Sequence, residues 1–155
     1  MILWVLKRKR NNMPRKIYVA SSWRNQHQNS VVRACRALGH EVYDFKNPKL
    51  DDKGFTWSEI DQDWLNWTPK NYVNILHDSP IVAAGFKNDM DALLWCDTCI
   101  LLLPCGRSAH LEAGYCIGQS KKTFVFVSNE KFEPDLMYKM ANMVTSNRED
   151  IYNAL

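Results

Sequence analysis

Short apolar runs alternate with amphipathic segments along most of the chain. Runs typical of buried strands lie at 16–20, 41–45, 99–103 and 122–128, and a shorter run at 143–145 is typical of an edge strand. Between them, apolar residues spaced three and four apart predict helices at 26–38 and 79–95, and a further helix begins at Ser108. A short helix is expected at 134–140, and the capping box Ser146-x-x-Glu149 predicts a last helix at 146–154. A strand, a helix and a second strand in this order form a parallel pair.

The order of these elements sets the fold class. It predicts an α/β protein, a flavodoxin-like three-layer α/β/α sandwich whose parallel sheet has the strand order 2-1-3-4-5. A length of 155 residues and a hydrophobic content of 46% fit a single domain, which we place at 15–155. Residues 1–14 are apolar and then basic, the opposite order to a secretory signal, and we expect them to form a mobile N-terminal extension.

The segment 46–77 departs from this regular alternation. It is rich in aromatic residues, with aspartates between them, and short helices are expected near 58–64 and 69–76; the aromatic residues are Phe55, Trp57, Trp64, Trp67 and Tyr72. One interpretation is a hydrophobic cluster packed on the edge of the sheet. The other is a lid whose rings stack on a planar ligand. We expect a mixture of the two, with one ring reaching the ligand.

The stretch 99–115 carries the most specific chemistry. Its apolar strand is broken by Pro104 and Gly106, and Ser108 is placed to start a helix that has Glu112 in its first turns. A strand, a tight turn and a helix place a ligand at the carboxyl end of a parallel sheet. Glu112 either complements the dipole of that helix or acts on a ligand there, and spacing alone leaves both interpretations open.

Asp89 is the second candidate carboxylate. On the predicted helix 79–95 it falls in the same narrow arc as Val82, Phe86 and Leu93, whereas Asp91 points to the opposite face. A carboxylate on an inward stripe must be paired or functional, because burying it alone is costly. Asp89 therefore either caps a loop, pairs with an arginine or belongs to a site.

The topology lets these side chains meet. The first and third strands end at the same rim of the sheet, so Tyr18, Glu112 and Asp89 can converge there. Two carboxyl groups beside one anomeric carbon suit the cleavage of a glycosidic bond through an oxocarbenium-like transition state. One attacks the carbon and the other gives a proton to the leaving group, while a tyrosine hydroxyl orients the attacking oxygen. This chemistry needs no metal, and we expect no cofactor.

The residues Pro104-x-Gly106-x-Ser108-x-x-x-Glu112-x-Gly114-Tyr115 resemble the signature of the nucleoside 2-deoxyribosyltransferase family and its nucleotide N-glycosidase relatives. The resemblance covers the chain from about residue 16 to its end. It implies that Glu112 is the nucleophile. It further implies that Asp89, preceded by an asparagine as in the family, addresses the nucleobase, and that Tyr18 contacts the nucleophile.

The chain departs from the family pattern at the sugar pocket. Gly106 stands where the transferases carry an aspartate, and Asp135 stands where an asparagine enters the neighbouring subunit's site. We expect weaker contacts around the sugar or phosphate from Ser21, Gly106, Arg107 and Ser108, and a contribution from Asp135 of an adjacent subunit. Arg107 is either a phosphate ligand at the helix N-terminus or a surface arginine.

Three functions remain open. The first is transfer of a 2-deoxyribosyl group between nucleobases through a covalent glycosyl-glutamate intermediate. The second is hydrolysis of the N-glycosidic bond of a (deoxy)nucleoside 5′-monophosphate, which shares the covalent step and uses water as the acceptor. The third is a non-catalytic nucleotide-sensing module of the related Toll/interleukin-receptor kind. We expect the first, an enzyme with a nucleoside or nucleotide and a free nucleobase as partners, assembled as a homo-oligomer.

Charge and cysteine content limit the partners and the cellular compartment that the sequence predicts. A net charge of +3 is too mild to predict binding to a nucleic-acid polymer, and no stretch is long and apolar enough to predict a membrane span. Five cysteines without a secretory signal predict a reducing cytoplasm. Cys96 and Cys99 precede a strand and lack a second pair at zinc spacing, so we expect core thiols.

Overall fold

The computed structural model describes residues 13–128 and 132–155. Residues 1–12, which make up most of the predicted N-terminal extension, lie outside the described residues. Within the described ranges, every helix is too short or too polar to cross a lipid bilayer. The described residues form a central sheet with helices on each side of it.

A five-stranded parallel sheet forms the centre of the molecule. Its strands are β1 (Lys16–Ala20), β2 (Glu41–Tyr43), β3 (Thr98–Leu102), β4 (Lys122–Phe126) and β5 (Met143–Thr145). They lie in the order β2-β1-β3-β4-β5, and every neighbouring pair is parallel. The predicted fold class and strand order are confirmed.

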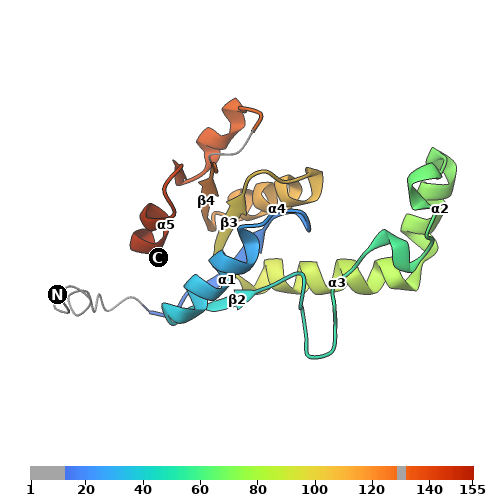
Figure 1. Ribbon diagram of the computed structural model, residues 1–155, viewed down its shortest axis with the longest axis horizontal. Coiled ribbons are helices and arrows are strands. Elements are labelled where there is room, and N and C mark those ends of the chain that lie inside the picture. The colour runs from blue at the N-terminus through green and yellow to red at the C-terminus, as the bar shows by residue number, and fades with distance from the viewer. Residues whose placement is uncertain (1–12, 129–131) are drawn as a thin grey trace.

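Helices cover both faces of this sheet (Figure 1). The helices of the structure are α1 (Gln28–Ala37), α2 (Pro69–Asp78), α3 (Pro80–Trp95), α4 (Arg107–Gly118) and α5 (Arg148–Ala154), with 3₁₀ turns at Trp57–Glu59, Trp64–Asn66 and Leu136–Met140, and all of the α-helices except α2 pack against the sheet. Side chains of α1 and α5 pack in one buried cluster, and those of α3 and α4 pack in a second cluster on the opposite face. The central strand β3 is buried at all five positions, as its continuous apolar run predicts.

Strand alternation decides which residues face the site. In β1, Ile17 and Val19 join the α1/α5 cluster, whereas Tyr18 and Ala20 join the α3/α4 cluster. Tyr18 thus lies on the side of the sheet that α3 and α4 cover. Tyr18 is fully buried there, directly across from Tyr43 in the register of β1 and β2.

Several predicted boundaries were wrong by one or two residues. β2 ends at Tyr43 because the buried Asp44 side chain accepts a hydrogen bond from the Lys46 backbone N–H at 3.0 Å and turns the chain. The helix expected from Ser108 begins at Arg107, with Gly106 as an extended N-cap. The last helix is capped by Asn147 rather than by residue 146, since the Asn147 side chain accepts from the Glu149 N–H.

The segment between β2 and α2 crosses α3 on its way out (Figure 1). Gly85 of α3 lets the Phe55 ring lie directly on the helix backbone, because an added Cβ would stand 2.9 Å from Phe55 Cβ. The Asn88 side chain donates to Asp52 at 3.2 Å, which fixes the same segment one turn further along. Beyond this crossing, α2 and the start of α3 project away from the sheet.

Gly54 sets the start of this crossing segment and gives a test of it. Its φ of +76° is left-handed, and an added Cβ would stand 2.2 Å from the Phe45 carbonyl oxygen. Gly54→Ala should therefore lower the free energy of unfolding by more than the roughly 1–3 kcal/mol of a left-handed residue alone. Gly39→Ala is the matched control, since φ is +91° there but the space is open. Equal losses in urea unfolding for the two variants would contradict the close contact at Gly54.

Candidate active site

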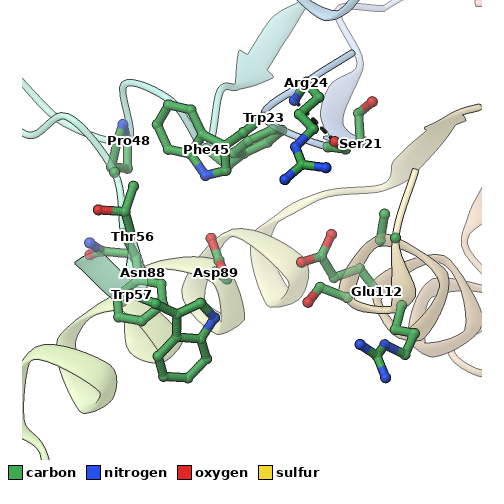
Figure 2. Close-up of a pocket in the computed structure, with 18 of the residues that line it drawn as sticks. Ser21, Trp23, Arg24, Phe45, Pro48, Thr56, Trp57, Asn88, Asp89 and Glu112 are labelled. Atoms are coloured by element: carbon green, nitrogen blue, oxygen red, sulfur yellow. Dashed lines mark hydrogen bonds between the residues drawn. The ribbon is translucent and has the colours of Figure 1, made fainter. Parts of the chain in front are cut away.

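A cavity of about 660 Å³ opens at the carboxyl ends of β1 and β2, against the sides of α3 and α4 (Figure 2). Its walls come from the loop after β1, the crossing segment, the middle of α3 and the N-terminus of α4. The lining includes Ser21, Trp23, Arg24, Tyr43, Phe45, Trp57, Trp64, Asn88, Asp89, Gly106, Arg107, Ser108 and Glu112. Residues far apart in the chain therefore share one surface.

Glu112 and Asp89 both face this cavity, from α4 and α3 respectively (Figure 2). Burial is the main cause that raises the pKa of Glu112 to about 7, and the charge of Asp89 raises it further. Burial also raises the pKa of Asp89. Two half-buried carboxyl groups with raised pKa values in one cavity are typical of a functional site, and an acid and a nucleophile are roles that such a pair can take.

Tyr18 lies beneath the cavity and links the sheet to Glu112. Its hydroxyl is buried, and within 13–128 and 132–155 it has no hydrogen-bond partner in good geometry. Burial raises the pKa of Tyr18, and Glu112 is the charged group that raises it most. The nearby phenol of Tyr18 in turn lowers the pKa of Glu112. Its role as an orienting hydroxyl stays a prediction.

Asp89 has a partner that the sequence did not indicate. The Tyr43 hydroxyl donates to Asp89 Oδ1 at 2.8 Å, and the Tyr43 ring stacks on Tyr18 with centroids 5.2 Å apart. The signal that could have found it is the parallel register, because the last residue of β2 stands beside the middle of β1. The helix prediction for Asp89 was correct in placing it inward, but Phe86, expected in the same inward arc, is 67% exposed.

The N-terminus of α4 forms one wall of the cavity. Gly106, Arg107 and Ser108 all line it, and the N-terminal N–H groups of this twelve-residue helix have no side-chain cap. Arg24, from the loop after β1, is a second arginine that lines the cavity and that sequence reasoning missed. Ser21 also lines the cavity, and its Oγ donates to the Leu102 carbonyl at 3.1 Å, which ties this loop to β3.

Asp135 is not brought to this cavity within one chain. It caps the 3₁₀ turn Leu136–Met140 by accepting from the Met137 N–H at 2.7 Å. It lines a separate hollow together with His110 and Tyr138. Its expected contribution to the site of an adjacent subunit stays a prediction.

The aromatic segment contributes to the cavity wall with more than one ring. Phe55, Trp57 and Trp64 line the cavity, together with Phe45 and Trp23 from outside the segment, and the contact of one of these rings with a ligand stays a prediction. Trp67 and Tyr72 lie behind, edge-on to Trp57 at 5.7 and 5.9 Å between centroids. The second group supports the first, so the wall is aromatic and braced.

None of the five cysteines lines this cavity. All five are free, and four of them are buried; Cys96 Sγ and Cys116 Sγ are 3.9 Å apart in the core. Within the described part of the chain, no three side chains of His, Cys, Asp or Glu gather as a group that could hold a metal ion.

The raised pKa of Glu112 makes stability depend on pH. The folded state holds this proton up to about pH 7, whereas the ordinary value is 4.5, so the folded state loses stability as pH rises between these values. Glu112→Gln removes the penalty, on the order of 3 kcal/mol, and should raise the melting temperature by several degrees at pH 8 but little at pH 4.5. Glu149→Gln, on exposed surface of α5, is the control. An equal effect of Glu112→Gln at both pH values would contradict the desolvated carboxyl.

Comparisons with known proteins support the fold. No family model matches the chain, and no curated protein matches it. Among solved structures, a 2-deoxyribosyltransferase from the psychrotolerant bacterium Bacillus psychrosaccharolyticus is similar with a TM-score of 0.60 and 19% identity, over 88% of this chain and 90% of that one. The CMP N-glycosidase BcmB of Clostridium botulinum aligns with a TM-score of 0.48 and 14% identity, over 89% and 96%. The chain thus shares its fold with a 2-deoxyribosyltransferase, as the sequence motif predicted.

Proposed function

We propose that this chain is an enzyme that cleaves the N-glycosidic bond of a nucleoside or nucleotide and transfers the 2-deoxyribosyl group to another nucleobase. The observation that carries the proposal is the pair of Glu112 and Asp89, which face one cavity with raised pKa values. A structural similarity to a 2-deoxyribosyltransferase supports the same activity.

Each carboxyl group has one role. The Glu112 carboxylate attacks C1′ of the sugar, and a C–O bond forms as the C1′–N bond breaks. The bonding electrons pass to the base nitrogen, which takes a proton from Asp89. The covalent glycosyl-glutamate is then attacked by the nitrogen of a second base, which gives its proton to Asp89 and releases Glu112. Tyr18 orients the Glu112 oxygen for both displacements.

The two ends of the cavity suit the two ends of a nucleotide. Phe45 and Trp57 lie on the Asp89 side in Figure 2, whereas Arg24 and Ser21 lie on the side of Glu112. An aromatic wall beside the proton donor suits a planar base, since rings stack on either of its faces. The sugar then lies over Glu112, between the two ends.

The basic end favours a second candidate, the hydrolysis of a (deoxy)nucleoside 5′-monophosphate. Arg24 and Arg107 line the same cavity as the uncapped N-terminus of α4, and Gly106 leaves that terminus open. Backbone N–H groups and arginines together bind phosphate. Transfer and hydrolysis share Glu112 and Asp89 and differ only in the acceptor. A non-catalytic nucleotide-sensing module would bind the same ligand without turnover.

Assembly and location complete the proposal. A second copy of the chain would bring Asp135 to the sugar pocket in a homo-oligomer, since Asp135 is exposed and lies away from its own cavity. Free thiols at all five cysteines fit a reducing cytoplasm.

Removing either carboxyl group should stop the reaction. Glu112→Ala should abolish product from a deoxynucleoside and a free base, and Asp89→Asn should lower kcat by about 10²–10⁴-fold, because each takes away one part of the displacement. Asp91→Asn is the matched control, since it lies on the same helix as Asp89 with its side chain 57% exposed. Retained turnover in Glu112→Ala would remove the mechanism, and tight nucleotide binding without product in the wild type would favour the sensing module.

The choice between the candidates rests on the arginines. If the substrate is a 5′-monophosphate, Arg107→Ala and Arg24→Ala should raise its KM at least about tenfold and leave the KM of the unphosphorylated nucleoside unchanged. Arg33→Ala, on exposed surface of α1, controls for net charge. Liquid chromatography with and without a free acceptor base then separates exchange from hydrolysis. Equal activity on both substrates in all variants would exclude a phosphate subsite.

A further inference from the structure

Tyr18 and Tyr43 form a stacked pair beneath the cavity. They are direct partners in the register of β1 and β2, so their rings leave the sheet on the same side. The ring centroids are 5.2 Å apart with an angle of 23° between the planes. One hydroxyl lies beside Glu112, and the other donates to Asp89 at 2.8 Å. Each proposed catalytic carboxyl group therefore has its own phenol.

We propose that Tyr43 is a positioning residue for Asp89, whose hydroxyl aims the carboxyl group at the departing base and stabilises the carboxylate that remains once the proton has been given. The inference rests on the proposed function and adds a residue that the family motif does not contain. Tyr43 is held in place from two sides, by the backbone pairing of β2 with β1 and by its stack on the fully buried Tyr18.

The hydrogen bond has a defined chemical sense. A phenol donates more strongly to a carboxylate than to a carboxylic acid, so it lowers the pKa of Asp89 and opposes the effect of burial. A proton donor with a lower pKa transfers its proton more readily to a base nitrogen. Tyr43 therefore matters most in the transition state, when negative charge develops on Asp89.

The charged groups that affect the pKa of Tyr43 are all acidic. Burial raises the pKa of Tyr43, as do the charges of Asp89, Glu112 and Asp52 from α3, α4 and the crossing segment. Tyr43 therefore stays protonated and remains a donor throughout the working pH range. The cationic groups that line the cavity, Arg24 and Arg107, come from other elements and are unchanged by a substitution at Tyr43.

Tyr43→Phe tests the inference because it keeps the ring stack and removes only the hydroxyl. We expect kcat for a deoxynucleoside, or its 5′-monophosphate, to fall at least about tenfold with KM nearly unchanged. For a nitrophenyl 2-deoxyriboside, whose leaving group needs no proton, kcat should change less than about twofold. Tyr152→Phe on α5, against the opposite face of the sheet, is the control. Equal losses on both substrates would overturn the inference.

Two further readouts separate positioning from folding. In Tyr43→Phe the descending, high-pH limb of the kcat profile should move upward, since Asp89 then keeps its proton longer. In the Asp89→Asn background, Tyr43→Phe should have no further effect, because the group through which it acts is gone. Additive losses, or an unmoved high-pH limb, would contradict the assigned role.

The inference and the proposed function can fail separately. Carbon-detected NMR titration of Asp89 needs no turnover and should show a higher pKa in Tyr43→Phe than in the wild type, with no change in Tyr152→Phe. An unchanged Asp89 titration in an active enzyme overturns the role of Tyr43 alone. A wild-type protein that cleaves no N-glycoside overturns the proposed function, and with it the catalytic use of this hydrogen bond.

Discussion

Two partly buried acidic side chains share one cavity, and this costly arrangement shapes the rest of the structure. Water stabilises the charges of the half-buried Glu112 and Asp89 less well than it would on open surface, so burial raises the pKa of each. A tyrosine lies beside each carboxyl group, Tyr18 beside Glu112 and Tyr43 beside Asp89. Because these tyrosines stand on neighbouring strands, the parallel pairing of β1 with β2 is itself a part of the site.

The fold could be predicted from the sequence because its signals are local. Buried parallel strands are continuous apolar runs, and amphipathic helices between them leave little choice of order. Local signals also singled out both carboxyl groups. Asp89 lies on the inward stripe of a predicted helix, and Glu112 belongs to a strand-turn-helix motif. Both line the cavity in the structure.

The parts that could not be predicted depend on tertiary contacts. The contact of Tyr43 with Asp89 depends on the register of β1 and β2, and the place of Arg24 in the cavity depends on the path of the loop after β1. The start of α4 was misplaced because Gly106 takes an extended conformation without a side-chain bond, which composition does not reveal. The aromatic wall was recognised as a whole, but which rings reach the cavity depends on how Phe55 rests on Gly85.

The central claim is that the Glu112 carboxylate bonds to the anomeric carbon. The most direct measurement is mass spectrometry of the protein after incubation with a 2-fluoro-2-deoxynucleoside, with or without a 5′-phosphate. The first displacement forms the adduct, and the adduct accumulates because the fluorine slows the second displacement more than the first. The account predicts one added fluorodeoxyribosyl group, located on Glu112 by peptide sequencing and absent from Glu112→Gln. An adduct on another residue, or turnover with no covalent species in rapid-quench samples, would contradict it.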